Sequence, residues 1–525
     1  MAKIGKNILE NLTTGMYSDS KVSYREYIQN ACDQIDKAIE MGIVTAETAE
    51  VSISIDKNNR YISIEDNATG VKANEFISQL GDIANSDKKI GVDKGFRGIG
   101  RLCGLAYCKT LVFTTSYKNE AIASCMSFNA KLMREMLISD KKYSVDEIID
   151  AIMKIETFKE DIDKHYFKVE LIEINHENTE LLNDEAVREY LSFVAPVPYS
   201  NKFYFRHEIY KYAAKLNLKI DEYNITINGA QIFKEYKCRL YEGNINMKKA
   251  YDDIFGLEFK EFYNKEKLIA WMWYGLSRFE KAIPKSLNPM YGLRLRQGNI
   301  QIGDNTVLSS LFKEERGNSY FIGEIFAVDK SLIPNSQRNY FNETLERIQL
   351  EEQLKLFFDG ELYKIYYIAN ETKNNYKKLE SYNEVVAKLE EKNTKGFVDN
   401  KELVRMEIAV EEARKKKDTA KKKLDKITET ISATESLTPI QRVQKEIKHK
   451  FEEKKVSTNT EKAEKKETEI TVQKDNKKPR YFTENLSKLD KSKRKLVRQI
   501  MGIVSQIAPE NITKEIQEAI EKEFR

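Results

Sequence analysis

Three polar side chains lie on one face of a helix predicted over residues 22–41. Glu26, Asn30 and Asp33 are separated by four and three residues, which places them in one row along the helix. Amide and carboxylate oxygens are hard ligands that suit Mg²⁺ or the water molecules bound to it. A glutamate one turn away could accept a proton from an attacking water molecule. An ordinary solvated helix face has the same spacing, so this segment alone leaves both interpretations open.

Two loops in the same part of the chain add a further carboxylate and several glycines. Asp66 follows a strand predicted over residues 61–65, and Gly70 closes the small-residue turn after it. Gly95, Gly98 and Gly100 directly precede an apolar helix, where backbone N–H groups suit a phosphate. This loop is neither the dinucleotide-binding fingerprint nor a Walker A loop, because the other residues of those motifs are missing. Each loop taken alone is also compatible with a plain turn.

The elements that must position these side chains predict an α+β fold. Helical stretches in the first 350 residues are interspersed with strand-like runs at residues 51–55, 61–65, 110–115, 167–174 and 223–227. The last 175 residues hold only three of the 22 glycines, which predicts a mostly helical region. Apolar residues recur there every three or four positions. This pattern favours a coiled coil or helical hairpin, and a solvated helix with a narrow apolar seam is equally compatible with it.

The composition excludes several classes of protein. The 525 residues carry a net charge of +4 with a charged fraction of 32%, which argues against a dedicated polyanion-coating protein. No apolar run approaches the ~18–20 residues of a membrane span, and the N-terminus lacks the apolar core of a signal peptide. The five cysteines and four histidines lack the spacing of a disulfide scaffold or a zinc site. We therefore expect a soluble, cytoplasmic protein without membrane contact.

The order and spacing of the polar segments resemble the ATP-binding motifs of the GHKL superfamily, which includes gyrase, heat-shock-90 chaperones, histidine kinases and MutL. Residues 25–36 look like the first motif in its heat-shock-90 form, and residues 66–70 resemble the second motif, DxGxG. Residues 80–86 resemble the start of the ATP lid of the chaperones, and residues 95–100 its glycine-rich end. The resemblance implies a Bergerat fold, in which helices cover one face of an antiparallel sheet and ATP lies beneath a mobile lid.

This resemblance assigns roles to individual residues. It makes Glu26 the general base for the hydrolytic water, Asn30 the Mg²⁺ ligand and Asp33 a residue of the pocket wall. Asp66 would accept a hydrogen bond from the adenine amino group. The further nucleotide-binding positions that it implies are Gly70, Asn85, Gly95, Gly98 and Gly100.

The chain departs from the family pattern at two places. Ala68 replaces the first glycine of the DxGxG motif, and Lys164-His165-Tyr166 stands where a Gly-Thr pair usually precedes the last strand of the sheet. Both departures concern the adenine side of the expected pocket, whereas the phosphate side keeps its pattern.

A second stretch of resemblance lies further along the chain. Residues 291–300 and 323–338 look like the middle domain of heat-shock-90-like proteins, where an arginine reaches the γ-phosphate of ATP from outside the nucleotide domain. Arg338 holds the matching place. A loop guanidinium could neutralise transition-state charge on the phosphate only when the domains close. A surface arginine paired with Glu343 or Glu346 is the plainer alternative.

These observations predict five regions. They are an ATP-binding domain (1–200), a middle domain (201–350), a helical coiled-coil region (351–432), a charged flexible linker (433–480) and a C-terminal helical hairpin (481–525). We expect a heat-shock-90-like ATPase that uses ATP and Mg²⁺, closes as a homodimer on ATP binding, and acts on a protein client or partner through its C-terminal helices. The alternatives are an ATP-driven clamp on DNA resembling MORC or MutL, and a nucleotide-gated scaffold with little turnover.

Overall fold

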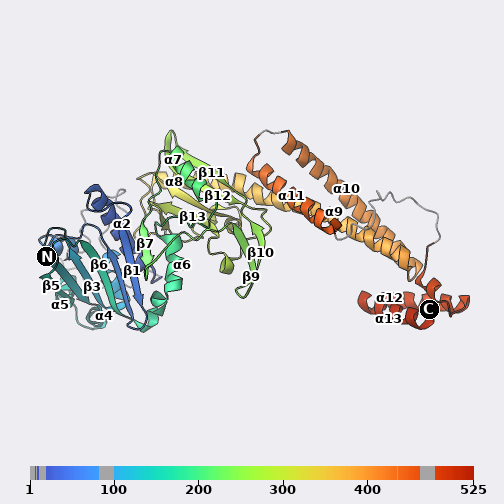
Figure 1. Cartoon of the computed structure of the whole chain (residues 1–525), viewed down its shortest axis with the longest axis horizontal. Coiled ribbons are helices and arrows are strands. Elements are labelled where there is room, and N and C mark those ends of the chain that lie inside the picture. The colour runs from blue at the N-terminus through green and yellow to red at the C-terminus, as the bar shows by residue number, and fades with distance from the viewer. Residues whose placement is uncertain (1–5, 7–8, 11–18, 82–99, 434–435, 461–478) are drawn as a thin grey trace. The chain divides into compact units, whose positions relative to one another are not determined.

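The computed structural model describes residues 6, 9–10, 19–81, 100–433, 436–460 and 479–525. Its contacts divide the chain into two compact units, Met1–Tyr363 and Lys364–Arg525 (Figure 1). The first unit combines sheets with helices and the second consists mainly of helices, which confirms the predicted α+β fold with a helical C-terminal third. Among the described helices, none combines the length and the apolar character that a bilayer crossing requires.

An eight-stranded sheet forms the base of the first unit. Its strands are β1 (Glu50–Asp56), β2 (Tyr61–Asp66), β3 (Cys108–Ser116), β4 (Ile122–Asn129), β5 (Met153–Lys159), β6 (Tyr166–Ile174), β7 (Asn224–Ile227) and β8 (Ala230–Gln231). They are ordered β5-β4-β3-β6-β2-β1-β7-β8, and only the β1–β7 pair is parallel (Figure 1). Because β7 and β8 come from beyond residue 200, this sheet continues past the boundary that we expected for the first domain.

Helices pack against this sheet and share one apolar core with it. They include α2 (Val22–Glu40), α3 (Phe76–Gly81), α4 (Ala130–Ile138), α5 (Val145–Ile152) and α6 (Asp184–Val194). Helix α2 contacts β1 and β2, and its Ile28 and Ile35 enter the core. On β2, Ile62 and Ile64 face the same core, and Asp66 continues their alternating row. Its carboxylate therefore lies on the side of the sheet that α2 covers.

The rest of the first unit is built on a five-stranded sheet with the order β11-β12-β15-β13-β14. These strands are β11 (Gly256–Asn264), β12 (Lys267–Leu276), β13 (Gly292–Gln297), β14 (Ile300–Ile302) and β15 (Ile322–Ala327). Helix α7 (Arg206–Lys215) and the hairpin β9 (Arg239–Asn244) and β10 (Met247–Asp253) precede this sheet, and α8 (Leu345–Phe357) packs on β11 and β12. Arg338 lies in the loop between β15 and α8.

The second unit is built on α9 (Tyr363–Lys395), α10 (Asn400–Ser432) and α11 (Pro439–Thr460). Tyr376 of α9 stacks on Phe451 of α11 with the ring centroids 4.7 Å apart, and Val443 of α11 is buried. The prediction of a flexible linker over residues 433–480 is therefore wrong for α11. Its few apolar side chains are spaced so that they pack on the neighbouring helices, which the charged composition of the segment obscured.

Two short helices, α12 (Lys491–Ile507) and α13 (Glu510–Phe524), form a hairpin at the C-terminus. One face of this hairpin covers the turn between α9 and α10, where Val398 shares a small core with Phe482, Leu486 and Met501. Gly396 has a φ of +95° in that turn, and a Cβ there would lie 2.4 Å from the backbone nitrogen of Phe482. This close approach between the backbones of Gly396 and Phe482 explains why residue 396 is glycine. It also holds the segment before the hairpin against the turn between α9 and α10.

Candidate functional site

Helix α2 carries the first row of predicted site residues. Glu26 and Asp33 are buried and Asn30 is half-buried, because the opposite face of α2 is anchored in the core by Ile28 and Ile35. The three side chains follow one another along the helix, as their spacing predicts. The structure thus brings two carboxylates and an amide to one face of α2, which packs on β1 and β2.

An ion pair with the preceding residue orients Glu26. Arg25 Nη2 lies 3.0 Å from Glu26 Oε1, and the two side chains are only 6% and 11% exposed. The same Nη2 donates to the carbonyl oxygen of Gln337 at 3.1 Å. One arginine therefore connects the candidate general base with the loop that carries Arg338.

Gly100 lies against the other oxygen of Glu26. A Cβ at Gly100 would be 2.5 Å from Glu26 Oε2, so a larger residue there would force the carboxylate to move. Gly100 begins a 3₁₀ helix, Gly100–Ala106, that is fastened to α2 through Tyr27. The Tyr27 hydroxyl donates to the carbonyl of Arg101 and accepts from the N–H of Gly104, both at 3.0 Å. Burial raises the pKa of Tyr27 well above its usual value, which keeps this hydroxyl protonated as a donor.

The turn after β2 holds the second predicted carboxylate. Asp66 is 3% exposed and accepts a hydrogen bond from the N–H of Ala68 at 3.1 Å. Gly70 has a φ of +68°, and a Cβ there would be 1.9 Å from the carbonyl oxygen of Ser116. The fold itself therefore requires glycine at position 70, because the backbone of β3 passes directly over it.

The two departures from the family pattern meet in space. His165 Nδ1 lies 2.8 Å from the carbonyl oxygen of Ala68, so the residue at the missing Gly-Thr position contacts the residue at the missing glycine. Next to them, the Thr115 hydroxyl donates to the backbone carbonyl of Tyr166 at 2.7 Å and accepts from the N–H of Val71 at 2.9 Å. Sequence reasoning did not assign a role to His165, although the paired departures were the signal that could have found it.

The loop between β15 and α8 brings the side chain of Arg338 into contact with α2. The residue is 7% exposed and has a φ of +53°, an uncommon backbone conformation for a side chain of this size. With the Gln29 amide oxygen turned toward it, the guanidinium donates from Nη1 at 2.7 Å and from Nη2 and Nε at 3.2 Å each. Gln29 is three residues from Glu26 and one from Asn30. The structure thus brings Arg338 to the helix that carries the predicted base.

A cavity of about 830 Å³ borders this contact. Its lining includes the cationic side chains Lys21, Arg25, Arg294 and Arg338, together with the aromatic rings of Tyr190 and Tyr291 among others. Three carboxylates, those of Asp19, Glu189 and Asp304, also line it. The cavity leaves space beside the guanidinium of Arg338.

Asn30 is the described residue whose chemistry suits a metal held mainly by nucleotide phosphates. Groups of three or more His, Cys, Asp and Glu side chains that could hold a metal ion do not occur in the described part of the chain. Mg²⁺ in nucleotide sites needs only one or two protein ligands beside the phosphates, and the half-buried amide of Asn30 suits that role. Asn85, Gly95 and Gly98 lie outside the described residues.

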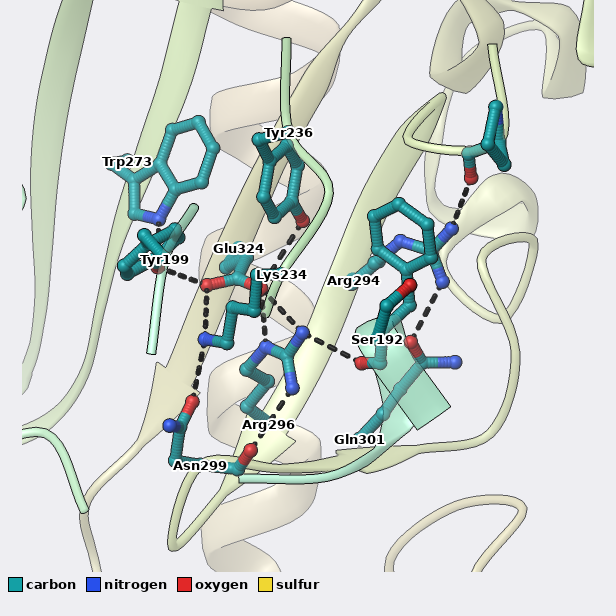
Figure 2. A network of polar contacts seen from close by, with 12 residues as sticks. Ser192, Tyr199, Lys234, Tyr236, Trp273, Arg294, Arg296, Asn299, Gln301 and Glu324 are labelled. Atoms are coloured by element: carbon teal, nitrogen blue, oxygen red, sulfur yellow. Dashed lines mark hydrogen bonds and ion pairs between the residues drawn. The ribbon is translucent and has the colours of Figure 1, made fainter. Parts of the chain in front are cut away.

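Figure 2 shows a second polar cluster of the first unit. Glu324 accepts from Arg296 Nε at 2.5 Å, from Lys234 at 3.0 Å and from the Tyr236 hydroxyl at 3.1 Å, and the Tyr199 hydroxyl also donates to it. The side chains of Glu324, Arg296 and Lys234 are fully buried. We call this group of five residues the Glu324 network.

The Glu324 network joins α6 to the five-stranded sheet. Arg296 of β13 donates to the carbonyl of Phe193 in α6 at 2.7 Å. It also donates to the carbonyl of Asn299 at 3.0 Å (Figure 2). Burial alone would raise the pKa of Glu324, but the charges of Arg296 and Lys234 outweigh it and lower that pKa to about 2. Sequence reasoning missed this network, because the positions of Lys234, Arg296 and Glu324 along the chain gave no sign that they are buried together.

Comparison with known proteins shows a family similarity for the part of the chain that contains most of α2. Residues 25–162 match the family described as histidine kinase-, DNA gyrase B-, and HSP90-like ATPase. The chaperone protein HtpG of Methylibium petroleiphilum is 38% identical over 95 residues, which are 17% of this chain and 15% of HtpG. The HtpG of Buchnera aphidicola subsp. Baizongia pistaciae is 29% identical over 142 residues, which are 26% of this chain and 20% of HtpG.

The HtpG of Acinetobacter baylyi is 39% identical over 88 residues, which are 16% of this chain and 14% of HtpG. The predicted resemblance to the GHKL superfamily in its heat-shock-90-like form is thus confirmed for the N-terminal domain. The chain covers about a fifth or less of the length of each of these relatives.

Proposed function

We propose that the first unit binds ATP with Mg²⁺ and hydrolyses it, and that closure of the lid and domains couples hydrolysis to action on a protein client or partner. One observation carries this proposal. Arg338 comes from a loop more than 300 residues along the chain from Glu26, yet its guanidinium contacts Gln29 on the same helix. A cation outside the ATP-binding motifs next to the candidate base is what hydrolysis assisted from a second domain needs.

Each residue has a distinct task in this mechanism. Asp66 accepts from the adenine amino group at the end of β2, and the amide oxygen of Asn30 holds the metal. Bound Mg²⁺ supplies positive charge that offsets the negative charge of the phosphates. Glu26 takes the proton of the attacking water while Arg25 holds one of its oxygens in place. Arg338 stabilises the charge that develops on the γ-phosphate.

Rates of ATP turnover by the full chain test this mechanism. We expect turnover that stops when EDTA removes Mg²⁺, and binding of a non-hydrolysable ATP analogue that shifts the chain to a dimer in light scattering. The proposal is overturned if the purified chain binds ATP but releases no phosphate at any metal concentration, which would favour the scaffold with little turnover.

The exposed surface of the C-terminal hairpin supports the proposal that the chain binds a protein partner. On α12, Leu496, Ile500, Ile503 and Ile507 are between 48% and 80% exposed and recur every three or four residues. Such a row of exposed apolar side chains on one helix suits docking to another protein. The opposite face is already covered by the turn between α9 and α10, so this row is an apolar surface of the hairpin that is left for a partner.

The DNA-clamp alternative depends on the basic start of α12. Lys491, Lys493, Arg494, Lys495 and Arg498 lie there without an acidic residue between them. If the alternative holds, salt-sensitive binding of duplex DNA should be lost when four charges are reversed, those of Lys491, Lys493, Arg494 and Lys495. Ile503→Asp should instead abolish capture of a protein partner. Loss of function by charge reversal alone would replace the protein-partner proposal with the DNA clamp.

A further inference from the structure

The contact between Gln29 and Arg338 has a feature that the proposed mechanism does not yet use. The Gln29 amide oxygen receives all three donor groups of the guanidinium, at 2.7, 3.2 and 3.2 Å. Gln29 is only 1% exposed and lies on α2 between Glu26 and Asn30. Among the residues implied by the family resemblance, this position has no assigned role.

The backbone around Arg338 is held independently of its side chain. The backbone N–H of Arg338 donates to the backbone carbonyl of Asn335 at 3.1 Å. The backbone carbonyl of Arg338 accepts from the N–H of Gly303 at 2.8 Å. These bonds set where the side chain starts, but four rotatable bonds remain between Cα and the guanidinium. The adjacent cavity of about 830 Å³, which Arg338 itself lines, offers space into which the side chain could turn away.

We propose that Gln29 is a positioning residue that holds the guanidinium of Arg338 against α2, where it can act on the γ-phosphate. The inference rests on the proposed ATP hydrolysis. A neutral amide suits this task because it binds the guanidinium without cancelling its charge. A carboxylate at the same place would neutralise Arg338 and add negative charge beside Glu26, where phosphate charge must be accommodated.

A double-mutant cycle on the full chain tests this role. Gln29→Ala should lower kcat by about 10- to 50-fold with little change in the Kd for ATP, because a hydrogen bond to a charged group is lost. Arg338→Ala should lower kcat by about 100-fold. Gln29→Ala should add almost nothing in the Arg338→Ala background, since the residue acts only through the arginine.

Two further variants separate positioning from a structural role. Gln29→Glu keeps the size of the side chain, and we expect it to lower kcat because the guanidinium is neutralised. Gln353→Ala on α8 removes another glutamine whose amide donates to a backbone carbonyl, that of Tyr263, and should leave kcat unchanged. Circular dichroism melts of all variants confirm that each is folded.

The outcomes distinguish failure of the inference from failure of the proposed function. If Arg338→Ala lowers kcat but Gln29→Ala leaves it unchanged or raises it, the positioning role is wrong and the proposed function stands. Additive losses in the double variant would also overturn the inference. If Arg338→Ala itself has no effect, the proposed role of the arginine in hydrolysis fails.

Discussion

Two clusters of arginine and glutamate in the first unit use the same chemistry in different surroundings. Around Glu26, Arg25 pairs with one carboxylate oxygen, Gly100 faces the other, and the Glu26 side chain keeps 11% of its exposure. Around Glu324, both oxygens are satisfied by four neighbouring side chains, and the carboxylate is fully buried. The first carboxylate stays partly exposed, whereas the second is fully buried and its hydrogen bonds are complete. The difference shows that burial and saturation separate a candidate reactive group from a structural one.

The difference also determines what each cluster contributes to stability. A buried charge that loses its partner costs roughly 3–5 kcal/mol, because it cannot be solvated. A pair at the edge of a domain loses much less, since water replaces the missing partner. Substitution at the two glutamates should therefore change different properties of the protein, and the predictions below test that division.

The largest expected effect is on catalysis at Glu26. Glu26→Ala should lower kcat for ATP by about 10²- to 10⁴-fold, as loss of a general base does, and leave the Kd for ATP nearly unchanged. Phosphate release and equilibrium binding of a fluorescent ATP analogue measure the two quantities. Glu40→Ala, at the exposed end of the same helix, is the matched control and should retain wild-type turnover. Retained turnover in Glu26→Ala would place the base elsewhere.

At Glu324 we expect a loss of stability instead. Glu324→Gln leaves Lys234 and Arg296 buried without their carboxylate, which should cost roughly 3–5 kcal/mol of unfolding free energy. Urea denaturation followed by tryptophan fluorescence suits the measurement, because Trp273 donates to Tyr199 within the network. Glu351→Gln removes a half-exposed pair with Arg347 and should cost about 1 kcal/mol or less. Equal losses in the two variants would refute the comparison.

Acid should reveal the same network in the unmodified protein. The folded pKa of Glu324, about 2, lies below its ordinary value of 4.5, so the unfolded state takes up a proton first as the pH falls. The stability that the carboxylate contributes is complete above pH 4.5 and is lost between about pH 4.5 and 2. Unfolding free energies at pH 7, 5, 4 and 3 should fall over that window. The decline should be shallower in Glu324→Gln, and an unchanged slope would contradict the assignment.

A smaller effect is expected at Asp66, to which we assign adenine binding in the proposed mechanism. Asp66→Asn replaces a charged acceptor by an amide and should raise the Kd for ATP by about 10-fold, while kcat at saturating ATP changes little. Isothermal titration and steady-state kinetics separate the two constants. Asp56→Asn, at the half-buried end of β1, is a matched control that should change neither constant. A lower kcat with unchanged Kd would assign Asp66 to catalysis.

The smallest effect on ATP turnover is expected at the C-terminal hairpin. Ile503→Asp changes a side chain that is 58% exposed and should leave both turnover and the melting temperature within error. Met501→Asp, two residues away, places a charge in the small core with Val398 and should unfold the hairpin. If Ile503→Asp also lowers the melting temperature, the exposed row belongs to the fold and is not a docking surface.

The sequence predicted the elements of the site because they are local. The spacing of Glu26, Asn30 and Asp33 is a property of one helix, and β2 before Asp66 has a run of strand-forming residues that needs no distant partner. The helical C-terminal third followed from the scarcity of glycine. Boundaries were less predictable: β7 and β8 join the first sheet from beyond residue 200, and α11 occupies part of the expected linker.

Tertiary structure alone decided which distant residues meet. Gln29 and Arg338 are far apart in the chain, and Ala68 of the second motif contacts His165, which lies 97 residues further along the chain. The burial of Glu324 likewise depends on side chains from several strands and loops that only the folded chain assembles. The physical reason is the range of the interactions: helix and strand periodicity acts over a few residues, whereas desolvation and hydrogen bonding depend on contacts that chain topology creates.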